Sequence, residues 1–114
     1  MLSSDKLFSQ MNKILLDSGI DPLLKLDRIP AGFFFSWEGG LDQYEIPYNI
    51  KSIGSSAFQL SGLKKIKIPK SVVEIETYAF YDCYPNLKVI YEGSIEDWNN
   101  IEKEDTIGIN DSQV

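Results

Sequence analysis

The sequence predicts a small α+β protein built on a short solenoid, with a helical cap at its N-terminal end and an aromatic β-hairpin before the first full coil. Three observations support this prediction: apolar residues at helical spacing over residues 4–18, a Gly-Gly turn between two strand-like runs, and an internal repeat of 22 residues. A chain of 114 residues is long enough for one domain with a core of its own.

The first 30 residues predict two helices. A serine at position 3 or 4 suits the N-cap of the first helix, and Gly19 suits its end. The apolar face of this helix comprises Leu7, Phe8, Met11, Ile14 and Leu15. Asp21 can cap a second, short helix that starts at Pro22, and Pro30 ends it.

Residues 32–46 predict a β-hairpin, because two aromatic and aliphatic runs flank Gly39-Gly40. A two-residue Gly-Gly loop is typical of tight hairpin turns, and it would place Phe35 opposite Tyr44. A strand with three consecutive phenylalanines at the edge of a sheet can pair with a second copy. A homodimer through the hairpin edge is therefore an open alternative.

The internal repeat is the most informative feature of the sequence. Its first copy reads Ile46-Pro47-x-x-Ile50-x-x-Ile53-Gly54-x-x-Ala57-Phe58, and its second reads Ile68-Pro69-x-x-Val72-x-x-Ile75-Glu76-x-x-Ala79-Phe80. Strand-like runs follow at Leu63–Ile68 and Leu87–Ile90, and residues 41–46 form a degenerate third run. One such unit cannot bury its own apolar face, so neighbouring units must stack Ile53 on Ile75 and Phe58 on Phe80.

The repeat resembles the BspA-like leucine-rich repeat family, whose units read roughly Ile-Pro-x-x-Val-x-x-Ile-Gly-x-x-Ala-Phe-x-x-Cys-x-x-Leu-x-x-Ile. The resemblance covers residues 41 to about 101, with one extra residue between Cys83 and Leu87. The first unit has Leu60 or Ser61 where the family has cysteine. The segment from Gly93 to Trp98 resembles the one that closes the family's arrays, and we expect Trp98 to pack in that end.

The resemblance implies a right-handed parallel solenoid that recognises other proteins and is not an enzyme. The expected organisation is a helical cap with the first hairpin strand over residues 1–40, repeats with a closing segment over 41–101, and an acidic C-terminal tail over 102–114. These parts form one compact domain. We expect part of the tail to be mobile, because it is acidic and only weakly apolar.

Composition narrows the chemistry. The chain has no histidine and one cysteine, which excludes Ser-His and Cys-His nucleophile pairs, histidine metal sites and internal disulfides. We therefore expect no catalytic residue, no cofactor and no metal. Cys83 lies where the family places an inward-facing small residue, so we expect it to be packed, the alternative being a reactive thiol. Glu74 and Glu76 show no spacing typical of a cation site.

The charge is unevenly distributed. The formal net charge is −6, with six basic and three acidic residues over 46–91 but one basic and seven acidic residues over 92–114. The overall charge disfavours direct binding to nucleic acids and anionic membranes. No apolar run is long enough for a leader or a membrane span, so we expect a cytoplasmic protein. An alternative function is that of a small acidic inhibitor or nucleic-acid mimic, such as a phage counter-defence protein.

Strand alternation predicts the interaction surface. If Tyr44, Ile66 and Ile90 face inward at equivalent positions, their neighbours face outward, and Phe34 joins them through the hairpin. The resulting candidate protein-binding set is Phe34, Gln43, Glu45, Lys65, Lys67, Val89 and Tyr91. Aromatic anchors beside charges are typical of protein interfaces. The alternative is that Glu45 and Lys67 only form a cross-strand pair, worth about 0.2–1 kcal/mol.

Overall fold

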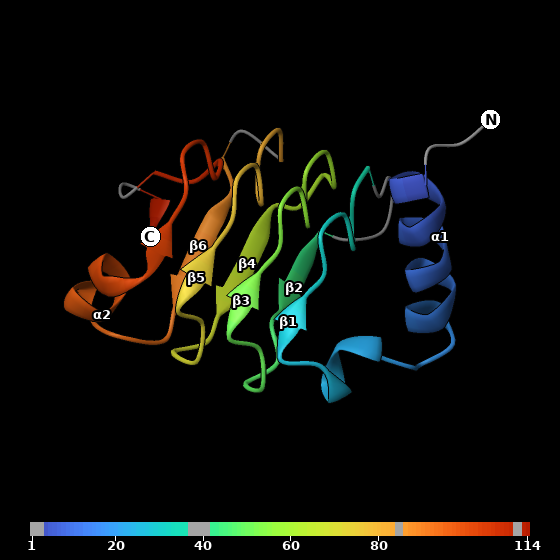
Figure 1. Ribbon diagram of the computed structural model, residues 1–114, viewed down its shortest axis with the longest axis horizontal. Coiled ribbons are helices and arrows are strands. Elements are labelled where there is room, and N and C mark those ends of the chain that lie inside the picture. Colours follow the sequence, from blue (N-terminus) through green and yellow to red (C-terminus); the bar gives the residue numbers. More distant parts are fainter. Residues whose placement is uncertain (1–3, 37–41, 84–85, 111–112) are drawn as a thin grey trace.

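Two parallel sheets lie between two α-helices in the part of the chain that the structure describes (Figure 1). The computed structural model describes residues 4–36, 42–83, 86–110 and 113–114. Its elements are α1 (Ser4–Asp17), η1 (Pro22–Lys25), β1 (Arg28–Ile29), β2 (Gln43–Glu45), β3 (Ser52–Ile53), β4 (Lys65–Ile68), β5 (Glu74–Ile75), β6 (Lys88–Tyr91), α2 (Ile95–Asn100) and β7 (Glu102–Lys103). The result is the mixed helix-and-strand fold that the sequence predicts.

The strands alternate between the two sheets along the chain. One sheet has the order β1-β3-β5-β7 and the other has the order β2-β4-β6, with every neighbouring pair parallel. Ile29, Ile53 and Ile75 pair in register, and each is fully buried. The repeat period therefore places equivalent apolar side chains on top of one another, and this alignment forms the core between the sheets.

A stack of phenylalanine rings continues this alignment through the turns that follow β1, β3 and β5. Phe58 lies between Phe34 and Phe80, with ring centroids 4.9 and 5.1 Å apart and nearly parallel planes. The backbone N–H of Phe34 donates to the carbonyl oxygen of Ala57 at 2.6 Å, and that of Phe58 donates to Ala79 at 2.7 Å. The predicted stacking of Ile53 on Ile75 and of Phe58 on Phe80 is confirmed.

The prediction of an aromatic hairpin is wrong for the residues described. Residues 31–36 form consecutive turns rather than a strand, and β2 pairs with β4 in parallel. Phe34 follows Ile29 at the spacing by which Phe58 follows Ile53, so residues 28–34 are an earlier, degenerate repeat unit. Stacking on Phe58 outweighs the strand propensity of the phenylalanine run. The proposed Gly39-Gly40 turn lies outside the described residues, and the homodimer edge loses its strand at 33–36.

The left-handed backbone positions repeat with the same period as the phenylalanine stack. Positive φ angles occur at Gly32, Ser56, Tyr78 and Thr106, each directly before the residue that packs in the position of Ala57. A second column comprises Ser36, Leu60 and Asp82, with φ angles of 55°, 59° and 54°. Because non-glycine residues rarely adopt this conformation, its recurrence shows that the stacked units impose the turn.

The N-terminal helix α1 forms as predicted, but its apolar stripe does not pack on the repeats. Leu7, Met11 and Ile14 are 52%, 56% and 66% exposed. The side facing the sheets instead carries buried Ser9 and Asn12, and Asn12 Nδ2 donates to the backbone oxygen of Phe33 at 3.0 Å. Helix α1 lies at the end of the molecule where β1 and β2 begin the sheets (Figure 1).

The second helix is shorter than predicted. It is a single 3₁₀ turn, η1, in which Pro22 takes the first position and the Asp21 carboxylate accepts from the N–H of Leu23 at 3.0 Å. The turn ends at Lys25 instead of at Pro30, because the chain then extends into β1 and pairs with β3.

The C-terminal segment is packed rather than a free acidic tail where it is described. Helix α2 starts with a capping box, in which Ser94 and Asp97 exchange side-chain and backbone hydrogen bonds, and it buries Trp98 as expected. Strand β7 follows and pairs with β5. The N–H of Phe80 donates to the oxygen of Ile107 at 2.7 Å, and Ile107 is buried. Apolar Ile107 thus extends the core by one level.

Candidate functional site

The outward face of the three-stranded sheet presents two rows of side chains. Strand β4 reads Lys-Ile-Lys-Ile, so alternation buries Ile66 and Ile68 and turns Lys65 and Lys67 away from the core. The register across β2, β4 and β6 aligns Gln43, Lys65 and Lys88 in one row. It aligns Glu45, Lys67 and Ile90 in the other. We call these six residues the sheet face.

The structure places Gln43, Glu45, Lys65 and Lys67 on the sheet face, as predicted. Phe34 does not belong to it, because this residue is completely buried in the phenylalanine stack. Both predicted contact roles that depended on the hairpin geometry therefore change: Phe34 is a core residue and Tyr44 is half-buried beneath the face.

The predicted register of β6 is wrong by one residue. Val89, not Ile90, pairs with Ile66, and Val89 is only 4% exposed. The extra residue between Cys83 and Leu87 is absorbed before the strand, so counting from the previous unit misplaces β6. Lys88 and Ile90 were missed for this reason. Matching the lysine of Lys88-Val89 to that of Lys65-Ile66 would have found them.

The sheet face is concave and mostly basic. Its side chains line a hollow of about 460 Å³ together with Tyr44. Three lysines stand against one glutamate on the face, and Lys67 Nζ lies 3.9 Å from a Glu92 carboxylate oxygen. The Tyr44 hydroxyl donates to Asp21 at 3.1 Å, and burial raises the pKa of this phenol, which keeps it neutral.

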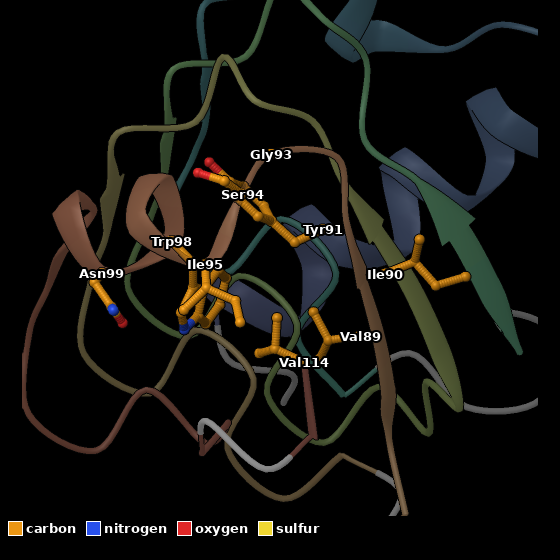
Figure 2. Close-up of a pocket in the computed structure, with 9 residues that line it drawn as sticks. All are labelled: Val89, Ile90, Tyr91, Gly93, Ser94, Ile95, Trp98, Asn99 and Val114. Carbon is orange, nitrogen blue, oxygen red and sulfur yellow. The ribbon is translucent and has the colours of Figure 1, made fainter.

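A second hollow of about 620 Å³ adjoins the sheet face beyond β6 (Figure 2). Strand β6 forms one side, and the start of α2 and Val114 form the rest. Tyr91, the last of the predicted contact residues, lies at this boundary, where its ring packs edge-on against Trp98 at 5.4 Å. The residues that line the hollow are Val89, Ile90, Tyr91, Gly93, Ser94, Ile95, Trp98, Asn99 and Val114.

Cys83 is held within the core and shows no feature of an activated thiol. Its Sγ donates to the backbone oxygen of Phe58 at 3.1 Å, and the Ser61 hydroxyl lies 3.6 Å away. Burial raises the pKa of Cys83 to about 11, so the nucleophilic thiolate is scarce at neutral pH. The sulfur therefore acts as a small packing group, as predicted.

The carboxylates of the other sheet are engaged in an ion pair with Arg28. Its guanidinium binds both carboxylate oxygens of Glu76, with nitrogen–oxygen distances of 2.5 and 3.0 Å. The Ser55 N–H also donates to Glu76 at 3.0 Å. These contacts lower the pKa of Glu76 and join the first repeat unit to the third. Among the residues searched, no three His, Cys, Asp or Glu side chains cluster as metal ligands would.

The comparison with known families decides the classification. A family model described as a BspA type leucine rich repeat region (6 copies) matches residues 27–103. The chain belongs to this family. The match begins at β1 and ends at β7, so this leucine-rich repeat protein starts its array one unit before position 41, in agreement with the strand pairing.

No curated protein and no solved structure matches the sequence. Leucine-rich repeats generally mediate contacts between proteins, and their family is typically not enzymatic. None of the described helices has the length and apolar character of a membrane span.

Proposed function

We propose that this leucine-rich repeat protein is a non-enzymatic interaction module that binds another protein through its sheet face. The observation that carries the proposal is the register of β2, β4 and β6, which lines up exposed polar and charged groups over a concave surface. Such a row of side chains on a rigid sheet suits recognition of a protein surface. It supplies charge, hydrogen bonds and one aliphatic contact, Ile90, without a nucleophile or an activated base.

We further propose that the two sheets form one short right-handed solenoid with α1 as its N-terminal cap. The edge-on contact of Phe8 with Phe33 at 5.6 Å and the hydrogen bond from Asn12 to Phe33 support the capping role. A repeat array needs its end units covered, because an uncovered unit exposes its apolar side. A rigid array keeps the rows of the sheet face at fixed spacing.

The charge of the sheet face favours an acidic partner. Lys65 and Lys88 are exposed and adjacent across β4 and β6, and Lys67 is half-buried beside them. Two like charges placed side by side repel each other in the free protein, and an acidic group bound between them relieves the repulsion. Binding should therefore weaken as salt is added.

The mimic alternative requires residues 102–114 to be free to enter a basic channel. The N–H groups of Glu102 and Glu104 instead donate to the backbone oxygens of Val73 and Ile75, both at 3.0 Å. Thr77 donates to the Glu104 carboxylate at 3.3 Å. These contacts hold the described part of the segment against the repeats, and they favour the sheet face over the tail as the interaction surface.

A charge reversal on the sheet face tests the proposal. Lys65→Glu should reduce the recovery of the partner by at least tenfold in an unbiased pull-down read by mass spectrometry, with an unchanged melting temperature. Lys51→Glu is the matched control, because Lys51 is equally exposed but begins the other side of the repeat unit. Equal recovery with both variants would reject the sheet face as the binding surface.

A further inference from the structure

The two sheets end at different levels, which leaves a strand position unfilled beside β6. Strand β7 extends the first sheet to four strands, whereas the second sheet stops at three. No described residue forms a strand next to β6 on the side away from β4. Strand β6 is therefore an edge strand at the level where the other sheet continues.

The hydrogen-bonding pattern of β6 identifies the groups that this edge presents. The N–H groups of Lys88 and Glu92 donate to the oxygens of Lys64 and Ile68 in β4, at 2.9 and 3.0 Å. In a parallel strand, alternate residues point their N–H and C=O to the same side, so those of Val89 and Tyr91 point away from β4. The described residues supply no hydrogen bond to the outward groups of these two residues.

One position further along the same edge is already satisfied in a strand-like manner. The side-chain amide of Gln113 donates to the backbone oxygen of Leu87 at 3.0 Å. By the same alternation, this oxygen points to the open side. The edge thus accepts a hydrogen bond from a group that is not part of a neighbouring strand, directly before the two outward residues Val89 and Tyr91.

The hollow of about 620 Å³ lies over these outward groups, and its volume is typical of a binding cleft. Ile95 is 80% exposed and Val114 is 43% exposed, although both line the hollow. Figure 2 shows β6 on one side of the opening and α2 on the other, with Ile95, Trp98 and Val114 gathered around it. The lining therefore supplies apolar contacts beside a row of backbone donors and acceptors.

We propose that the edge of β6 binds an extended segment of a partner protein as an added strand. Its backbone would pair with Val89 and Tyr91, and one of its apolar side chains would enter the hollow beside Ile95. Acidic residues of the segment would face Lys65 and Lys88. This inference rests on the proposed function, because it specifies how a partner reaches the sheet face through strand addition.

Charge complementarity selects the occupant. The face next to β6 carries three lysines, whereas residues 92–114, which include α2 and β7, carry seven acidic residues and one basic residue. A segment with its acids on the sheet side and neutral residues on the α2 side matches this division. A second copy of this chain would bring the same lysines against them, which is repulsive.

A library of displayed seven-residue linear peptides provides the probe. We expect selected peptides to alternate β-branched apolar residues with neighbouring Asp or Glu. A scan with one backbone N-methyl group per peptide then tests strand pairing, since it removes one donor at a time. Affinity should fall at least tenfold at every second position and less than threefold between them. Failure to select any peptide, or a scan without alternation, would overturn the proposal.

A matched pair of variants tests the hollow. Ile95→Glu should weaken peptide binding at least tenfold, whereas Val73→Glu should leave it unchanged, because Val73 is 59% exposed and does not line this hollow. Both side chains are exposed, so folding should be preserved. Equal affinities of the two variants would overturn the proposal.

The outcomes separate this inference from the proposed function. If Lys65→Glu abolishes peptide binding but N-methylation and Ile95→Glu do not, the sheet face binds and the edge does not. If sedimentation instead shows a dimer that Ile95→Glu dissociates, the occupant is a second copy and the inference of a partner segment fails.

Discussion

Truncating the central phenylalanine should measure how strongly the repeat units hold one another. Phe58 is fully buried between Phe34 and Phe80, so Phe58→Ala removes one ring from two stacked contacts and leaves a cavity. Buried Phe→Ala changes cost about 3–5 kcal/mol. Aromatic pairs contribute about 0.5–1.5 kcal/mol each beyond burial. Because domains of this size are stable by about 5–15 kcal/mol, the variant should be strongly destabilised.

Urea unfolding followed by circular dichroism gives the measurement. With a slope of about 2 kcal/mol per M, the midpoint should fall by about 2 M. Phe58→Leu keeps most of the volume but not the ring, and it should cost about 1–2 kcal/mol. Tyr48→Ala is the control, because Tyr48 is 69% exposed and its loss should stay within about 0.5 kcal/mol. A cost below about 1 kcal/mol for Phe58→Ala would refute the stacked core.

Three further predictions concern individual contacts. The lowered pKa of Glu76, caused first by its hydrogen bond with Arg28, means that this pair stabilises the fold above about pH 4.5 and stops doing so as the pH falls through the folded-state pKa. Glu76→Gln should therefore cost about 0.5–1 kcal/mol at neutral pH after solvent screening and nothing in strong acid; a pH-independent cost would contradict the ion pair. Leu60→Gly should stabilise by about 0.5–1 kcal/mol because the φ angle of Leu60 is +59°, whereas Gln59→Gly in the same turn should destabilise; the same sign for both would contradict the turn geometry. Iodoacetamide should alkylate Cys83 at least tenfold more slowly in the native protein than in urea at about pH 8, and equal rates would contradict its buried environment.

The stacked interior could be predicted because it depends on apolar residues at a fixed spacing. Ile53 and Ile75, like Phe58 and Phe80, are 22 residues apart, and a parallel array aligns such pairs whatever lies between them. The exposed alternation of Lys65 and Lys67 around Ile66 was readable for a similar reason, since a strand has period two.

The errors arose where local propensity and array geometry disagree. The run Phe33-Phe34-Phe35 has strong strand propensity, but Phe34 is drawn into the stack that starts from Ile29. In β6, burial of Val89 opposite Ile66 sets the register, and the preceding loop absorbs the extra residue. Neither outcome follows from spacing alone, because each depends on what the neighbouring unit already buries.

Hydrogen exchange of the protein with its captured partner bound tests the central claim most directly. We expect slowed exchange over residues 43–45, 65–68 and 88–91, which form the strands of the sheet face. Residues 28–29, 52–53 and 74–75 of the other sheet should exchange as they do in the free protein. Protection confined to the other sheet or to α1, with β2, β4 and β6 unchanged, would contradict the account.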